Sequence, residues 1–136
     1  MADVKVGLRW SGTGLQFSGG SAGGPEIAID GDGRAGVSPV TSLLLAVAGC
    51  MGADVVDIGR KMRLTLEALT VEVEADRRAE PPRRLMAVRL MFIATGVLPE
   101  DEGKLWRAID LSRDTYCSVL HSLREDVSIQ IGLELR

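Results

Sequence analysis

The chain has few of the histidine and cysteine side chains that make structural zinc sites. It contains one histidine, His121, and two cysteines, Cys50 and Cys117, which lie far apart and form no C-x-x-C motif. A structural zinc site needs four ligands, usually in closely spaced pairs. The sequence therefore predicts no metal site, and nothing in it calls for a bound cofactor.

The chain also lacks the charge excess of a nucleic-acid-binding protein. Its 16 basic and 19 acidic side chains give a net charge of −3 at pH 7, whereas proteins that bind phosphate backbones usually gather a basic excess on one face. No GxxxxGK[ST] motif occurs among its 16 glycines. We expect no nucleic-acid partner, and we interpret the glycine clusters as turns between strands.

No segment is typical of a targeting signal or a membrane span. The N-terminal "MADVKVGLRW" has no apolar stretch behind a basic start, so it is not predicted to be a secretory signal. The longest uncharged stretch, from Ala35 to Ala53, is interrupted by glycine, serine, threonine and proline, and a spanning helix needs about 20 mostly apolar residues. We expect a cytoplasmic protein without a membrane partner.

Hydrophobic patterning predicts a single α+β domain over residues 1–136. Short alternating runs separated by glycines predict three strands, and Ser38-Pro39 can then cap and open a long helix. Antiparallel sheet packed on helices suits the order of elements that follows. The expected strands are roughly 4–10, 15–17, 26–29, 64–76, 84–96 and 127–135. The expected helices are 39–63 and one opening at Pro99; that helix, or a second one after a break, carries 115–126.

The first half of the long helix is apolar on most of its faces, which predicts burial on nearly all sides. In a chain of 136 residues, one layer of sheet can bury only part of the surface of such a helix. A partner subunit would supply the missing cover, and a buried hairpin of two helices within one subunit would do so equally well.

The two cysteines allow two interpretations. Unpaired cysteine is often a small buried hydrophobe, but in a reducing compartment a disulfide, where one forms, is usually transient and catalytic. A reactive thiol must be a thiolate, and Asp54 and Asp57 on the Cys50 face of the helix would oppose ionisation. A cation from elsewhere would have to offset them, and the candidates are Arg9, Arg34, Arg60 and Lys61.

Two further candidates have ordinary explanations as well. His121 follows Cys117 by one helical turn, so it is either a partner of that thiol in nucleophilic catalysis or a surface histidine at a helix end. The arginines of "RRAEPPRR", residues 77–84, are interpreted as charges of a solvated hairpin loop rather than as an anion site.

The stretches "SPVTSLLLAVAGCMGADVVDIGRKMR" and "YCSVLHSLREDVSIQI", together and in this order, resemble the OsmC/Ohr family of osmotically inducible and organic hydroperoxide resistance proteins, in its OsmC-like branch. The match runs from "GLRWSGTGLQFSGG" to the last strand. The resemblance implies an OsmC-like fold, an intertwined homodimer whose sheets enclose the central helices, and active sites at the subunit interface.

The same resemblance implies that Cys50 is the peroxidatic and Cys117 the resolving cysteine of a peroxidase active in the oxidative stress response. Such an enzyme reduces an organic hydroperoxide through a sulfenic acid and a disulfide, which an external dithiol reopens. An apolar pocket around Cys50, lined by residues such as Leu44, Val47 and Met51, would suit an alkyl peroxide, although these residues also suit a plain core. The alternatives are a non-enzymatic dimer of this fold that senses redox state or binds a small apolar ligand, and a structural dimer with inert thiols.

The chain departs from the family pattern at the residues that activate the first cysteine. Val40 and Thr41 stand where better-characterised members have a glutamate, and "GTGLQF" stands where their N-terminal hairpin has an arginine. Arg9 is the nearest N-terminal candidate for the catalytic cation.

Overall fold

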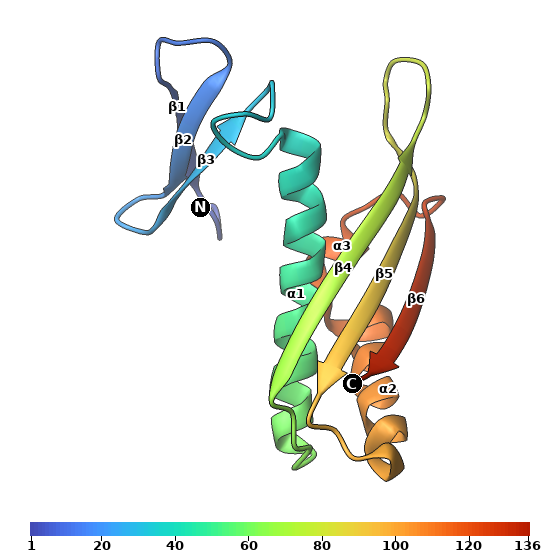
Figure 1. The fold of residues 1–136 in the computed structure, drawn as a ribbon. Coiled ribbons are helices and arrows are strands. Elements are labelled where there is room, and N and C mark those ends of the chain that lie inside the picture. The colour runs from blue at the N-terminus through green and yellow to red at the C-terminus, as the bar shows by residue number, and fades with distance from the viewer. The chain divides into compact units, whose positions relative to one another are not determined.

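The computed structural model describes all residues, 1–136, and the chain divides into two compact units, Met1–Leu44 and Leu45–Arg136. The boundary between them falls within helix α1 (Pro39–Lys61), the longest element of the chain. Figure 1 shows the order of the elements along the chain. The α+β class predicted from the sequence is confirmed, with a three-stranded sheet in each unit.

The first unit contains an antiparallel sheet of three strands in the order β1-β2-β3. Its strands are β1 (Val6–Trp10), β2 (Gln16–Ser21) and β3 (Glu26–Asp30). The prediction that β2 ends at Phe17 is wrong, because the strand continues through Gly19 and Gly20. Glycine is needed there since a Cβ on Gly19 would overlap the carbonyl oxygen of Gly7 on the neighbouring strand.

The loop after β3 is organised by one buried carboxylate. Asp30 is 2% exposed and accepts hydrogen bonds from the amides of Asp32 at 2.9 Å, Arg34 at 3.2 Å and Ala35 at 2.9 Å. The hydrogen bonds from Ala35 and then Asp32 hold the pKa of this carboxyl below its ordinary value. The loop "GDGRAG" has GxGxxG spacing, but its amides are occupied by the chain's own carboxylate, so it acts as a turn.

Helix α1 begins at Pro39 as the sequence predicts, and it ends at Lys61, two residues before the predicted end. The amide of Thr41 donates to Ser38 Oγ at 3.2 Å, and Pro39 takes the first helical position, where its missing N–H costs nothing. Arg60 and Lys61 lie in the last turn, where the helix dipole favours cations.

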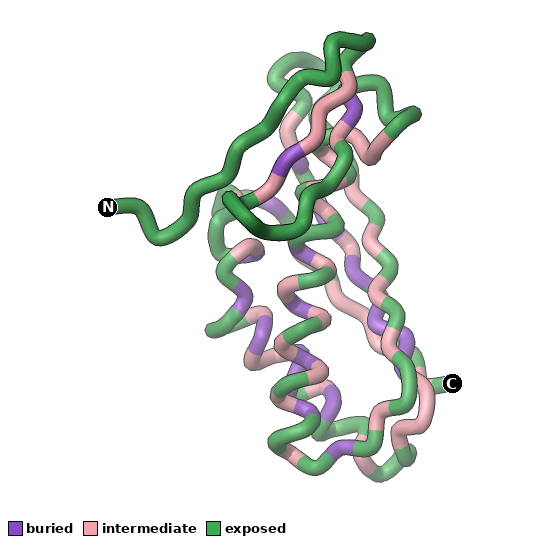
Figure 2. The backbone as a smooth tube through the Cα atoms, turned by 90° about the vertical axis from the view of Figure 1, so that its left-hand side faces the viewer, coloured by how far each residue is buried: buried purple, intermediate pink, exposed green.

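The second unit contains a sheet in the order β4-β5-β6, with helices on one face of it (Figures 1 and 2). Its strands are β4 (Ala68–Arg77), β5 (Leu85–Thr95) and β6 (Ser128–Leu135). The connection from β5 to β6 contains a 3₁₀ turn η1 (Pro99–Asp101), α2 (Glu102–Leu111), a π turn η2 (Ser112–Tyr116) and α3 (Ser118–His121).

One strand pairing differs from the antiparallel arrangement that the sequence predicts. Strands β4 and β5 form the expected antiparallel hairpin, but β5 and β6 are parallel. A parallel neighbour requires a crossover connection, and the helical segment between β5 and β6 provides one. The alternation of apolar residues predicts a strand but not the direction of its partner.

The core of the second unit lies between α1, α2 and the inner face of the sheet. Buried positions recur along the strands and on one side of each helix (Figure 2). In these elements the fully buried or nearly fully buried core side chains are Val47, Met51 and Val55 of α1, Val88, Leu90, Phe92 and Ala94 of β5, and Leu105, Ala108 and Ile109 of α2.

Helix α1 is covered along one stripe only. Its buried residues, Val47, Met51, Val55 and Gly59, follow one another at intervals of four, so they form a single row. Leu45, by contrast, is 57% exposed. The sequence predicts that α1 is buried on nearly all sides, and a single chain does not bury it in that way. By length and composition alone α1 would also be able to cross a membrane, a test that core helices pass as well.

We predict that Asp30→Asn weakens the acid dependence of stability. Because the folded pKa of Asp30 is lowered from 3.8, its carboxylate stabilises the fold above about pH 4 and this contribution is lost as the pH falls through the folded value. The decline in free energy of unfolding between about pH 5 and pH 3 should be shallower in the variant, measured by urea unfolding. Asp32→Asn, which changes an exposed acid of the same loop, is the control and should keep the wild-type slope.

Candidate functional site

The structure brings the two cysteines together within the second unit. Cys50 lies in the middle of α1 and is half-buried, and Cys117 lies between η2 and α3 and is fully buried. Both are free thiols. The Cys50 side chain lies close enough to Cys117 to perturb its ionisation by hydrogen bonding and by charge.

Cys117 is held by its backbone and its sulfur. Its amide donates to the carbonyl of Ser112 at 2.8 Å, which closes the π turn η2. Its φ of −73° and ψ of 98° are extended, so the helical path stops there and α3 starts anew. The Sγ atom then accepts a hydrogen bond from the amide of Leu120 at 3.3 Å, which makes Cys117 the N-cap of α3.

The surroundings of Cys117 keep it protonated. Burial raises the pKa of this thiol to about 11, and the hydrogen bond and charge of Cys50 together with the charge of Asp54 act in the same direction, against the Leu120 amide. Since the thiolate is the reactive form of cysteine, Cys117 is a poor nucleophile at neutral pH as long as nothing else activates it.

The two acids that follow Cys50 on α1 have different partners. Asp54 Oδ2 accepts a hydrogen bond of 2.8 Å from the hydroxyl of Ser112, a residue with 0% exposure. Asp57 is exposed and pairs with Lys61 at 3.0 Å. Asp54 thus faces the turn that carries Cys117, and Asp57 has an ion-pair partner of its own. The sequence analysis missed Ser112, because an isolated serine at the end of an amphipathic helix gives no signal.

Two of the four candidate cations are paired with other groups. Arg9 belongs to the first unit, where its guanidinium pairs with Glu26 at 2.7 Å, and both side chains are largely exposed. Lys61 is paired with Asp57. Within the second unit no ion pair or hydrogen bond joins a basic side chain to Cys50, so the geometry of that unit alone does not supply an activating charge.

The histidine and two of the four hairpin arginines likewise have partners away from the thiols. His121 Nε2 lies 2.8 Å from the carbonyl oxygen of Arg113, to which a ring N–H donates, and it makes no hydrogen bond to the Cys117 thiol. Arg77 Nε donates to the carbonyl of Arg83 within the loop, at 2.9 Å, and Arg84 pairs with Asp126 at 3.4 Å. No group of three or more His, Cys, Asp or Glu residues is arranged to hold a metal ion.

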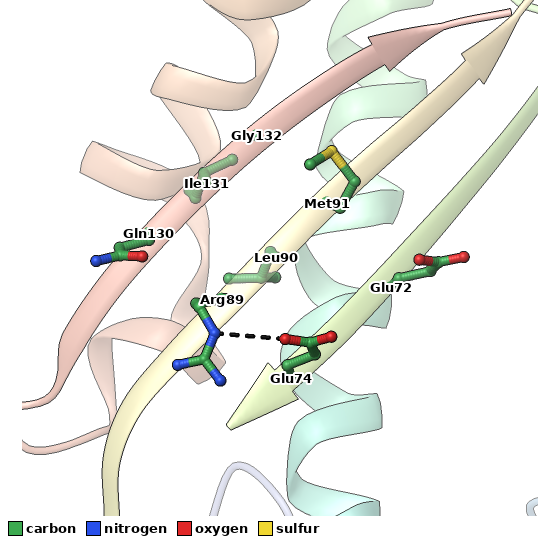
Figure 3. Close-up of a pocket in the computed structure, with 8 residues that line it drawn as sticks. All are labelled: Glu72, Glu74, Arg89, Leu90, Met91, Gln130, Ile131 and Gly132. Atoms are coloured by element: carbon green, nitrogen blue, oxygen red, sulfur yellow. Dashed lines mark hydrogen bonds and ion pairs between the residues drawn. The ribbon is translucent and has the colours of Figure 1, made fainter. Parts of the chain in front are cut away.

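A separate hollow of about 420 Å³ lies over the β4-β5-β6 sheet, with Arg89 in its wall (Figure 3). The guanidinium is already bound: it donates to Asp76 at 2.9 and 3.1 Å and to Glu74 at 3.5 Å. Neither cysteine lines this hollow. It is a charged sheet surface whose arginine is already paired, and the thiol pair remains the candidate site.

The arrangement defines a class of protein: an α+β chain in which a long helix presents one free thiol to a second, buried thiol. The family model for OsmC-like proteins matches residues 30–132, a range that includes both cysteines. The chain is also 39% identical over 133 residues to Protein YhfA of Escherichia coli K12, covering 97% of this chain and 98% of that relative. It therefore belongs to the OsmC-like protein family.

Solved structures share this fold over the full chain. A hypothetical protein from Aquifex aeolicus VF5 has a TM-score of 0.86 at 26% identity, covering 100% of this chain and 98% of its own. An organic hydroperoxide resistance protein from Legionella pneumophila has a TM-score of 0.68 at 14% identity, with coverage of 98% and 99%. The long apolar α1 is accounted for as the core helix of this fold.

We predict that the two thiols are alkylated in a fixed order. With a pKa of about 11, only about one Cys117 in a thousand is a thiolate at pH 8, and the residue is buried. Limiting N-ethylmaleimide at pH 8 should therefore modify Cys50 at least about tenfold faster than Cys117, as read by peptide mass spectrometry. In denaturant both should react alike, and faster labelling of Cys117 in the folded protein would contradict the assignment.

Proposed function

We propose that the protein is a thiol-dependent peroxidase that reduces organic hydroperoxides, with Cys50 as the peroxidatic and Cys117 as the resolving cysteine. The proposal is carried by one observation: two free thiols adjoin each other, one half-exposed on α1 and one buried. Membership in the OsmC-like family and the name of the Legionella relative support it.

The reaction balances in three steps. The Cys50 thiolate attacks the terminal oxygen of the hydroperoxide, the O–O bond breaks, and Cys50 becomes a sulfenic acid. The alkoxide takes up the proton that was released when Cys50 ionised and leaves as an alcohol. The sulfur of Cys117 then attacks the Cys50 sulfur, and the hydroxyl leaves as water with the proton of the Cys117 thiol. An external dithiol reduces the resulting disulfide and is itself oxidised to a disulfide.

The two environments suit these two roles. A peroxidatic thiol must be reached by its substrate, and Cys50 is the accessible one of the pair. A resolving thiol is needed only after the sulfenic acid has formed, so a buried, protonated Cys117 does not compete for the peroxide. Val47 and Met51 are fully buried and act mainly as core, so they contribute at most the apolar floor beneath Cys50.

Arg9 is the cation that we propose for the activation of Cys50. Its guanidinium is held by Glu26 on a strand of the same sheet, at 2.7 Å. A carboxylate that orients an arginine is the combination that would stabilise a thiolate, and here it arises from residues other than those of the better-characterised relatives.

We further propose that the chain acts as an intertwined homodimer, a single OsmC-like domain per subunit, in the cytoplasm. The uncovered faces of α1 support the dimer, because a monomer would leave a long apolar helix in water. Gly49, Gly52 and Ala53 line a groove beside β4 and would let a second helix approach closely.

A second candidate function is a non-enzymatic dimer of this fold that senses redox state, or binds a small apolar ligand, near the same cysteines. The observation that favours it is the lack of a cation bonded to Cys50 within its own unit. A weakly activated thiol would be oxidised slowly, which suits a sensor better than a catalyst.

We predict that one equivalent of cumene hydroperoxide removes two hydrogens from the reduced protein. The disulfide accounts for that loss, so Cys50→Ser should abolish it, and Cys117→Ser should instead gain one oxygen as a Cys50 sulfenic acid. Intact-mass spectrometry under non-denaturing conditions measures both outcomes, and an unchanged wild-type mass would refute the peroxidase. Steady-state peroxide consumption with dithiothreitol then distinguishes the two functions. A catalyst should turn over repeatedly, whereas a sensor would react only once.

We predict that Gly49→Leu converts a dimer to a monomer. A Cβ at Gly49 meets no atom within 4 Å in this chain, so a larger side chain is harmless to the isolated subunit but would clash with a second helix packed there. Light scattering coupled to size exclusion should show the mass halved while the helical circular dichroism persists.

The matched control is Gly103→Leu on α2, where a Cβ also meets nothing within 4 Å. This variant should keep the wild-type mass in solution. A wild-type monomer, or a Gly49→Leu protein that remains a dimer, would contradict packing through this face of α1.

A further inference from the structure

Asp54 and Ser112 form a polar contact inside an otherwise apolar interface between helices. Ser112 has 0% exposure and Asp54 is half-buried, and neighbours of theirs such as Met51 and Ile109 are fully buried core residues. A carboxylate in such surroundings is costly unless it is hydrogen-bonded. The hydroxyl of Ser112, at 2.8 Å from Oδ2, provides that bond, and no buried side-chain polar atom of the chain is left without a partner.

Ser112 forms hydrogen bonds through both its side chain and its backbone. Its hydroxyl donates to Asp54 on α1, and its carbonyl oxygen accepts the amide of Cys117 at 2.8 Å. Two consecutive hydrogen bonds therefore connect α1 to the backbone of Cys117. Their starting point on α1 lies one helical turn after Cys50, on the same side of the helix.

We propose that Asp54 is a positioning residue for disulfide formation, acting through Ser112 to hold the π turn η2, and with it Cys117, beside Cys50. This proposal rests on the proposed function. Asp54 takes no part in bond making: Cys117 attacks the Cys50 sulfenic acid, and the departing hydroxyl takes up the thiol proton as water.

The disulfide step is the one that needs this positioning. A disulfide forms only when the two Cα atoms come within about 7 Å with suitably directed Cβ atoms. The step that precedes it involves Cys50 and peroxide alone. Loosening of η2 should therefore slow the closure of the disulfide and leave the oxidation of Cys50 unchanged.

The oxidation of Cys50 and the closure of the disulfide are measured separately in quenched reactions. Reduced protein is mixed with one equivalent of cumene hydroperoxide; residual peroxide gives the rate of the first step, and dimedone trapping with intact-mass analysis gives the lifetime of the sulfenic acid. The loss variants are Asp54→Ala and Ser112→Ala. Asp57→Ala on the same helix is the matched control, because that acid is exposed and bonded to Lys61.

In the loss variants we expect peroxide consumption within about twofold of wild type. Disulfide closure should slow about tenfold or more, because a part-buried, charge-assisted hydrogen bond is lost. The control should close at the wild-type rate. Asp54→Asn and Ser112→Thr, which retain an acceptor oxygen and a hydroxyl, should restore closure, and they keep the test decisive should an alanine variant fail to fold.

The outcomes distinguish this proposal from the one on which it rests. Wild-type closure rates in folded Asp54→Ala and Ser112→Ala would refute the positioning role and leave the peroxidase intact. Equal slowing of both steps would also refute it, since a general loss of structure explains that result. If wild-type Cys50 does not consume peroxide at all, the proposed function itself fails.

Discussion

The second unit depends on one stripe of α1 that packs against α2 and the sheet. Val47, Met51 and Val55 point into the core at intervals of four residues. Cys50 and Asp54 each come one residue before a member of this stripe, so they form a second row at its edge, neither fully buried nor free in solvent. The turn after α2 meets that row, with Cys117 near Cys50 and Ser112 bonded to Asp54. The way α1 packs into the core thus determines that Cys50 and Asp54 face the turn after α2.

The thiols differ because of where the backbone places them rather than because of their own sequence surroundings. Cys117 sits at the break between η2 and α3, where its sulfur caps a helix and is sealed from water. Burial there outweighs the Leu120 amide and favours the neutral thiol. Cys50 sits on an unbroken helix surface and keeps some access. A single chain therefore carries one accessible thiol and one buried, neutral thiol, and burial accounts for the state of the second without a metal or a neighbouring histidine.

Local signals in the sequence predict the elements better than they predict their pairing. The serine and proline at the start of α1 and the alternation in β4 and β5 are local signals, and the structure confirms the elements that they predict. The parallel direction of β6 follows from the crossover path of the chain, which no local pattern encodes. For the site, the spacing of Cys50 and Asp54 predicts a shared helix face, but their partners come from more than fifty residues away in the sequence. Ser112 has no sequence signal because its role depends entirely on that distant contact.

The parallel pairing of β6 with β5 also bears on the order of folding. Strand β5 is the middle strand of its sheet, yet one of its neighbours is encoded after both cysteines and after the whole helical crossover. Such non-local contacts carry a loop-closure cost and form late compared with a hairpin. Until β6 is added, β5 has a free edge, and the layer on which α1 and α2 rest is incomplete. Both cysteines precede β6 in the sequence, so both thiols are synthesised before this sheet can be complete.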